Sequence, residues 1–263
     1  MPAFNNSSHL YVAESGPSTG EAIVFLHGGG LGGRMWQPQV DAFPDYHCIV
    51  PDLPEQGRSL HHGPFTLDGA AEDVATIIRE LVPCGKAHIV GLSLGGAVAL
   101  TLLRLVPETV DHVIVSGTAA GLGKVLGTLS KASGLLYRVL PTDTLLHASL
   151  KQFHVPPHYH DLVVDDLLQS MNATFTTHFT DALMTMQLPQ TTTAPTLVAV
   201  GARETFPAKQ AARRITRTLR GARMVVVPGV GHLWNLEAPD LFTAMVRAWI
   251  TDDQLPAALE PGQ

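Results

Sequence analysis

The sequence predicts a doubly wound α/β fold with a mostly parallel sheet. Short runs rich in valine and isoleucine return along the chain, and several are apolar without alternation, as in strands covered on both faces. Helical apolar patterns lie between these runs, and such strand–helix–strand repeats are typical of parallel sheets with right-handed crossovers. The length of 263 residues favours one domain that carries an insertion.

The expected elements follow from apolar spacing and from the glycines and prolines that end each run. The expected strands are 22–27, 47–53, 88–93, 112–117, 196–201 and 223–229. One helix is predicted by the stripe Ala70, Val74, Ile77, Ile78 and Leu81. A second helix, over 95–106, is apolar nearly all round, so we expect it to be buried.

The stretch 118–189 has helical patterns but no convincing strand. It is too long for one crossover, which predicts a helical cap inserted into an α/β core formed by 1–117 and 190–250. Apolar positions at helical spacing occur in three parts of it: at 135–140, at 145–153 and at 171–186. The polar tail 251–263 contains two prolines and is expected to be poorly ordered.

Composition excludes several classes of protein. The 17 lysines and arginines against 23 aspartates and glutamates give a net charge of −6, which disfavours binding to nucleic acid. Cys48 and Cys84 are the only cysteines, too few for a disulfide framework or a thiolate metal cage. No signal peptide is evident and no run reaches the ~18 apolar residues of a membrane span, so we expect a cytoplasmic protein.

A nucleophile is indicated by the segment Gly91-Leu92-Ser93-Leu94-Gly95, which fits G-x-S-x-G. This motif requires a sharp turn from a strand into a helix, and the flanking apolar segments supply both elements. Glycines two residues before and after Ser93 would let the backbones approach while the serine projects its hydroxyl. The alternative is a glycine-rich turn in which the serine is incidental.

A serine hydroxyl needs a base and an orienting acid to act as a nucleophile. His232 follows the last expected strand, in a loop that would emerge at the same sheet edge as Ser93. Glu204 follows the strand before it, giving the chain order serine, acid, histidine. The alternatives are a surface role for Glu204 and, for the acid, Asp181 in the insertion.

Donors for an oxyanion are expected from backbone amides. The first strong strand ends in His27-Gly28-Gly29-Gly30, where glycines would let N–H groups approach a substrate oxygen. The amide of Leu94, directly after the nucleophile, supplies a second donor. A flexible loop without ligand is the alternative, and the stretch lacks the Gly-Lys-Ser/Thr ending of a phosphate-binding loop.

Taken together, these motifs make the chain similar to the α/β-hydrolase superfamily, in its serine-nucleophile branch with a helical cap. Further shared segments are His27-Gly28, Pro51-Asp52-Leu53-Pro54 and Gly231-His232 followed by Glu237. The resemblance implies a triad of Ser93, Glu204 and His232. It also implies that Gly29 and Leu94 supply the oxyanion amides.

Two positions depart from the pattern of this superfamily. Glu55-Gln56 stands where the family most often has Gly-His, and Glu204 stands where it usually has aspartate. The first departure bears on the shape of the pocket, and the second on the identity of the acid.

The resemblance implies a serine hydrolase that cleaves carboxylic esters of small to medium apolar substrates through an acyl-enzyme intermediate. No cofactor and no metal are expected, although the cap contains several histidines. Thioesters, lactones and carbon–carbon bonds remain alternatives on the same triad, as does a non-catalytic ligand receptor. The residues expected to line the substrate pocket are Gly28, Gly30, Trp36, Leu135, Phe175 and Leu233.

Overall fold

The computed structural model describes residues 10–123 and 142–262, and for 142–145 the backbone alone. Its strands form one sheet in the order β1-β3-β2-β4-β5-β6-β7-β8. Neighbouring strands from β3 to β7 are parallel, whereas β1 and β8 are antiparallel strands at the two edges. The strands are β1 (Val12–Ser15), β2 (Ala22–Leu26), β3 (His47–Pro51), β4 (Ala87–Leu92), β5 (Val110–Ser116), β6 (Thr196–Gly201), β7 (Arg223–Val227) and β8 (Glu260–Pro261).

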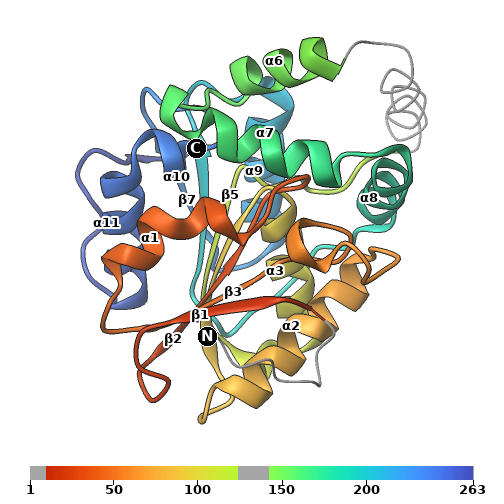
Figure 1. Ribbon diagram of the computed structural model, residues 1–263. Helices are drawn as coiled ribbons and strands as arrows, with labels where there is room; N and C mark the ends of the chain where they lie inside the picture. Colours follow the sequence, from red (N-terminus) through yellow and green to blue (C-terminus); the bar gives the residue numbers. More distant parts are fainter. Residues whose placement is uncertain (1–9, 124–141, 263) are drawn as a thin grey trace.

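Helices cover both faces of this sheet (Figure 1). They are α1 (Gln37–Ala42), α2 (Leu67–Leu81), α3 (Leu94–Leu105), α6 (Thr142–Gln152), α7 (His160–Ser170), α8 (Ala173–Thr185), α9 (Phe206–Thr218), α10 (Trp234–Glu237) and α11 (Pro239–Ile250). Short 3₁₀ turns are η1 (Gly33–Trp36), η2 (Gly57–Ser59), η3 (Pro107–Thr109) and η4 (Pro157–Tyr159).

The uninterrupted apolar strands are explained by burial on both sides. Alternate residues of β2 enter two different cores: Val24 and Leu26 pack with α2, α3 and α9. Ile23 and Phe25 pack with α1, α10 and α11 on the other face. Because a strand points successive side chains to opposite faces, both sets must be apolar. The predicted doubly wound architecture is therefore confirmed.

A local signal sets the start of α2. Its N-cap is Thr66, whose side chain accepts a hydrogen bond of 3.0 Å from the amide of Gly69. Such a bond satisfies one of the amides that a helix start leaves without a partner. Four residues of the predicted apolar stripe, Ala70, Val74, Ile77 and Ile78, are at most 1% exposed, and the fifth, Leu81, is half-buried.

The helices α6, α7 and α8 lie between β5 and β6 in the sequence, the interval expected for the cap, and we refer to them as the cap helices. In Figure 1 they lie across one end of the sheet, at the top of the view. Positions 135–140, expected to be helical, are outside the described residues. The limits of the cap itself stay a prediction.

The C-terminal segment is ordered, so the expectation of a poorly ordered tail is wrong for 251–262. Leu259 is buried, and Glu260–Pro261 forms β8, which pairs with β7. The amide of Gly262 also donates to the Met224 carbonyl over 2.9 Å. The pairing with β7, a further backbone hydrogen bond and the buried Leu259 thus attach a segment whose polar composition suggested disorder.

Candidate active site

Ser93 occupies the turn between β4 and α3. Its backbone has φ 55° and ψ −112°, a left-handed conformation that is strained for a residue with a side chain. The Ser93 amide donates to the Ser116 carbonyl over 2.8 Å, which holds the turn against β5. The side chain therefore projects from a fixed backbone at the carboxyl edge of the sheet.

The two flanking glycines make this turn possible. A Cβ atom added to Gly91 would lie 2.4 Å from the Gly95 carbonyl oxygen. One added to Gly95 would lie 2.1 Å from the Leu26 carbonyl oxygen. Backbones approach at both positions more closely than any side chain permits, as the sequence motif predicts.

Glu204 and His232 come together at the same edge. Glu204 follows β6, His232 follows β7, and their Oε1 and Nδ1 atoms lie 2.9 Å apart. The side chains are 5% and 17% exposed, respectively, so the pair is largely shielded from solvent. An imidazole that donates Nδ1–H to this carboxylate has Nε2 left to accept a proton. Asp181, the alternative acid, lies on α8 and lines a different cavity.

Gly117 makes room for this pair, a role that the sequence alone did not reveal. It has φ +59°, and an added Cβ atom would lie 2.7 Å from Glu204 Oε1 and 2.9 Å from His232 Nδ1. The only sequence signal was a glycine directly after an apolar strand. Its neighbour Ser116 accepts a 2.7 Å hydrogen bond from Trp234 Nε1, which ties β5 to the segment after His232.

The glycine loop after β2 lies beside the first turn of α3. A Cβ atom added to Gly29 would lie 3.6 Å from the Leu94 Cβ, so the two predicted oxyanion residues are adjacent. Leu94 is the first residue of α3, and its amide has no acceptor within the helix. The Gly30 amide instead donates to Gln56 Oε1 over 2.7 Å. Gln56 is fully buried, and its hydrogen bond holds the glycine loop in place. A position that departs from the family pattern thus supports this loop.

His27 fixes the start of this loop. Its Nδ1 lies 2.9 Å from the Gly28 carbonyl oxygen, and its Nε2 accepts a 2.8 Å bond from the Leu53 amide. These contacts require a neutral imidazole protonated on Nδ1. Burial lowers the pKa of His27, and the nearby carboxylate of Asp52 offsets this only partly. The neutral form that the loop needs is therefore favoured.

Ser93 and His232 line one cavity of about 250 Å³. The other described lining residues are Gly28, Gly29, Leu31, Leu92, Phe153, Leu167, Met171, Phe175, Thr176, Phe179 and Leu233. Three predicted pocket residues are among them, namely Gly28, Phe175 and Leu233. Leu135 is outside the described residues. Gly30 is not among the described lining residues and lies next to the Met171 side chain, which does line the cavity.

Trp36 does not line the cavity, so this prediction is wrong. Its side chain is completely buried, with ring centroids 5.3 Å from Phe25 and 5.5 Å from Phe242. The η1 turn carries it away from the glycine loop into the core beneath the sheet. A large indole has far more apolar surface to bury there than at a pocket rim.

The cap helices are attached to the glycine loop through α7. Asp166 Oδ2 accepts a 2.9 Å bond from the Gly32 amide, and its Oδ1 lies 2.6 Å from the Arg34 guanidinium. Asp166 is only 3% exposed, so its carboxylate is sheltered from water, whereas the Arg34 side chain is 48% exposed. The cap therefore contributes a fixed support to the loop that carries Gly29.

Two further contacts attach the cap near the site. The Phe153 ring lies 5.3 Å from the His232 ring, between centroids. Glu55, which with Gln56 forms the first departure from the family pattern, pairs with His178 on α8, with Nδ1 2.9 Å from the carboxylate. The cap thus contacts both the histidine loop and the segment after β3.

The model of the alpha/beta hydrolase family matches residues 23–245, which includes every element that positions this site. The chain belongs to the alpha/beta hydrolase family. It therefore has the alpha/beta hydrolase fold that the sequence predicts, and it is a hydrolase of that fold. In the described parts of the chain, no helix is long and apolar enough to cross a bilayer.

Three similar proteins illustrate the range of this family. An AB hydrolase superfamily protein of Gibberella zeae is 29% identical over 249 residues, covering 92% of this chain and 84% of the relative. A 2-hydroxy-6-oxononadienedioate/2-hydroxy-6-oxononatrienedioate hydrolase of Pseudomonas sp. is 26% identical over 262 residues, covering 92% and 91%. The crystal structure of a Mycobacterium tuberculosis protein with the provisional name non-heme bromoperoxidase BpoC has a TM-score of 0.76 and 26% identity, covering 92% and 96%.

Proposed function

We propose that this protein hydrolyses carboxylic esters with apolar groups of small to medium size, through an acyl intermediate on Ser93. The observation that carries this proposal is the shared cavity of Ser93 and His232, with Glu204 held on the far nitrogen of the imidazole. A strained serine, a base and an orienting carboxylate are the parts that activate a hydroxyl as a nucleophile.

In the acylation step, Ser93 Oγ attacks the ester carbonyl while His232 Nε2 takes the hydroxyl proton. The carbonyl oxygen gains negative charge, which the amides of Gly29 and Leu94 stabilise by hydrogen bonds. Glu204 stabilises the imidazolium through Nδ1–H and keeps the ring in its orientation. Collapse of the tetrahedral intermediate breaks the bond to the alcohol, which leaves with the proton from His232.

Deacylation uses the same groups on a water molecule. His232 takes a proton from water, whose oxygen attacks the acyl carbonyl, and the oxyanion forms again beside Gly29 and Leu94. Expulsion of Ser93 Oγ, which recovers its proton from His232, releases the carboxylic acid. Apart from the substrate and one water molecule, both steps use only groups that the chain supplies.

The cavity wall favours an apolar substrate of limited size. Its described lining is mostly aliphatic and aromatic, with Phe153, Phe175 and Phe179 from the cap. The volume of about 250 Å³ is at the small end for a ligand site, since typical pockets have about 300–1,000 Å³. A short acyl chain or a compact alcohol would fill it.

The lining argues against the dicarboxylates in the name of the Pseudomonas relative. A buried carboxylate requires a cationic or hydrogen-bonding partner. Among the described residues that line the cavity, none is an arginine or a lysine, and the polar side chains are Ser93, His232 and Thr176, the first two of which take part in the proposed reaction. A neutral ester carries no charge that the lining would have to compensate.

The test is hydrolysis of p-nitrophenyl esters of graded acyl length by the wild type and by Ser93→Ala. We expect the wild type to prefer short acyl chains. The substitution should lower kcat by about 10⁴-fold or more, because it removes the atom that forms the acyl bond. Ser18→Ala, at an exposed serine in the β1–β2 turn, is the matched control and should behave as wild type.

A thioester and a lactone of equal carbon number in the same assay identify the preferred bond. Faster turnover of either than of the matched ester would overturn the ester assignment. If Ser93→Ala kept the wild-type rate, the nucleophile would be wrong. Tight binding of a short apolar ligand by a wild type without turnover would identify a receptor instead.

A further inference from the structure

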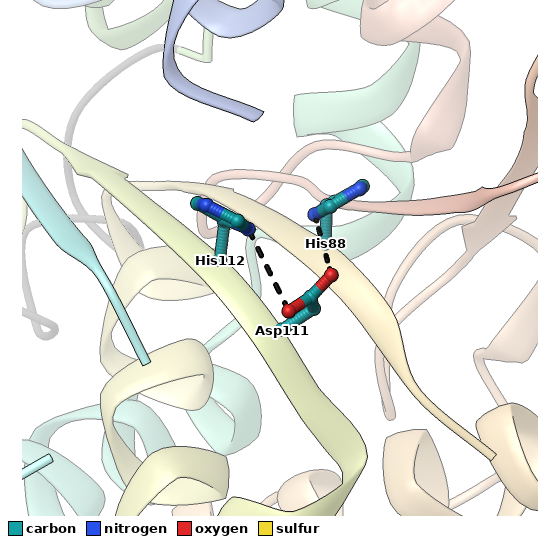
Figure 2. A group of neighbouring side chains, drawn as sticks. All are labelled: His88, Asp111 and His112. Atoms are coloured by element: carbon teal, nitrogen blue, oxygen red, sulfur yellow. Dashed lines mark ion pairs between the residues drawn. The ribbon is translucent and has the colours of Figure 1, made fainter. Parts of the chain in front are cut away.

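A second cluster of chemically reactive side chains lies at the amino ends of the parallel strands, at the end of the sheet opposite to Ser93. His88 is near the start of β4, while Asp111 and His112 are near the start of β5 (Figure 2). One ligand-capable atom from each of the three residues lies within 4.8 Å of the other two. Since β4 rises about 3.3 Å per residue, Ser93 is roughly 16 Å further along the same strand.

A register shift in the sheet brings the three together. Ala87 pairs with Val110, but Ile89 pairs with Val113, so that both Asp111 and His112 stand opposite His88. A residue inserted into one strand redirects side chains that would otherwise alternate between faces. As Figure 2 shows, the Asp111 carboxylate consequently lies between the two imidazoles, with an oxygen 3.7 Å from Nδ1 of each ring.

Three of the four imidazole nitrogens in this cluster are buried without a hydrogen-bond partner among the described residues. His88 is 3% exposed and His112 is 9% exposed. Nδ1 of His88 and both ring nitrogens of His112 have no hydrogen-bond partner among the residues that the structure describes. Leaving a buried polar atom unpaired costs free energy, so three such atoms in one place require an explanation.

A second carboxylate completes the arrangement. Asp252, in the segment after α11, places Oδ1 3.5 Å from His112 Nε2. Histidines that bind a metal through one nitrogen commonly direct the other toward a carboxylate, which fixes the ring. Asp111 and Asp252 are 51% and 82% exposed, so an ion and its water ligands can enter from solvent.

We propose that His88 Nδ1, His112 Nδ1 and the Asp111 carboxylate bind a divalent transition metal such as Zn²⁺, with water as the fourth ligand and Asp252 supporting His112. Two imidazoles and one carboxylate suit Zn²⁺ better than Mg²⁺ or Ca²⁺, which prefer oxygen ligands throughout. The ion would link β4 and β5 with the segment after α11, a stabilising role remote from Ser93.

The geometry of the cluster is compatible with such an ion. Tetrahedral Zn²⁺ with bonds of about 2.0–2.1 Å would separate its ligand atoms by about 3.4 Å. The Asp111 oxygens lie 3.7 Å from the two Nδ1 atoms and need to approach by about 0.3 Å. The three ligand atoms lie within 4.8 Å of one another, so no separation has to shorten by more than about 1.4 Å.

The experiment starts from full-length protein stripped with a chelator and measures thermal unfolding with added Zn²⁺ or with Mg²⁺. At a free Zn²⁺ concentration of about 100 Kd, we expect the Tm to rise by about 5 °C. Mg²⁺ should cause no rise. Calorimetric titration with Zn²⁺ should fit one strong site, and Co²⁺ in its place should give the visible absorption of tetrahedral Co²⁺ with nitrogen ligands.

Variants at the cluster decide where the ion binds. Asp111→Asn, at a half-exposed position, and the double variant His88→Gln/His112→Gln should each lose most of the Zn²⁺-dependent rise. His61→Gln, at an exposed histidine, is the matched control and should keep the rise in full. Ester hydrolysis should be unaffected by the chelator. Absence of any rise in the wild type, or an equal rise in Asp111→Asn, would overturn the proposal.

Discussion

The sheet core and the cap helices build opposite walls of the same cavity by different means. On the core side, Ser93, Glu204 and His232 follow the carboxyl ends of strands, and glycines let their backbones pack without intervening side chains. On the cap side, the wall consists mainly of apolar side chains such as Met171 and Phe179. In the proposed mechanism, the core therefore fixes the geometry of the reacting atoms, while the cap determines what fits beside them.

This difference predicts that substitutions in the two regions affect different kinetic constants. Rigid backbone contacts on the core side cannot relax when an atom is added or removed. Apolar side chains in the cap can repack around a smaller or larger substrate. Core substitutions should lower kcat on every ester, whereas cap substitutions should alter the preference among esters.

Among the substitutions that test this difference between core and cap, the largest effect is expected from Glu204→Gln. The amide retains the size of the side chain but loses the charge that stabilises the His232 imidazolium. We expect kcat to fall by about 10³- to 10⁴-fold with KM little changed, measured on the best p-nitrophenyl ester. Glu72→Gln, at an exposed position on α2, is the control. Wild-type turnover by Glu204→Gln would show that another group orients the imidazole, with Asp181 next to be tested.

A smaller loss is expected from Gly117→Ala. Its added methyl group would lie within 3 Å of both Glu204 Oε1 and His232 Nδ1, so this pair must separate. Displacing a catalytic group by about an ångström can cost about 100-fold in rate. We therefore expect kcat to fall by about 100-fold.

Gly85→Ala separates this contact from backbone strain. Gly85 also has a left-handed φ, +67°, but an added Cβ atom would meet nothing within 4 Å. Both variants should lose about 1 kcal/mol of unfolding free energy or more from strain. Only Gly117→Ala should lose activity. Equal kinetics for the two variants would contradict the contact as the cause.

The smallest effect on rate is expected from Phe179→Ala in the cap. Its ring approaches Gly29, with 3.3 Å between Cε2 and the position of an added Cβ. Removing the ring enlarges the cavity, so the ratio of kcat/KM for longer against shorter acyl esters should rise by about 10-fold. Phe206→Ala, at a phenylalanine 67% exposed on α9, should leave the ratio unchanged. An unchanged ratio in Phe179→Ala would assign the limit on chain length to the core side.

The sequence predicts the central sheet well and its edges poorly. All strands from β2 to β7 were expected, because residues buried on both faces give runs such as Ile23–Leu26 that only a strand explains. β1 and β8 were missed. Both are short and largely exposed, with little apolar pattern to mark them.

In the site, too, residues with a local sequence signal could be predicted, and residues whose role depends on distant contacts could not. The residues proposed for the triad, Ser93, Glu204 and His232, could be selected because each follows a strand in a defined chain order. Gly117 and Gln56 could not, since their roles depend on contacts with residues far away in the sequence. In the cap, spacing identified apolar positions such as Phe175 but could not tell which of them reach the cavity.

The short strand β8 also covers β7, which would otherwise be the free edge of the sheet. An uncovered β7 would present apolar side chains and unpaired backbone groups, the features that promote edge-to-edge aggregation. Pro261 pairs opposite Val225 and has no N–H to offer an incoming strand. The C-terminal segment 251–262 therefore covers an edge that would be prone to aggregation. We expect its removal to lower solubility before it lowers activity.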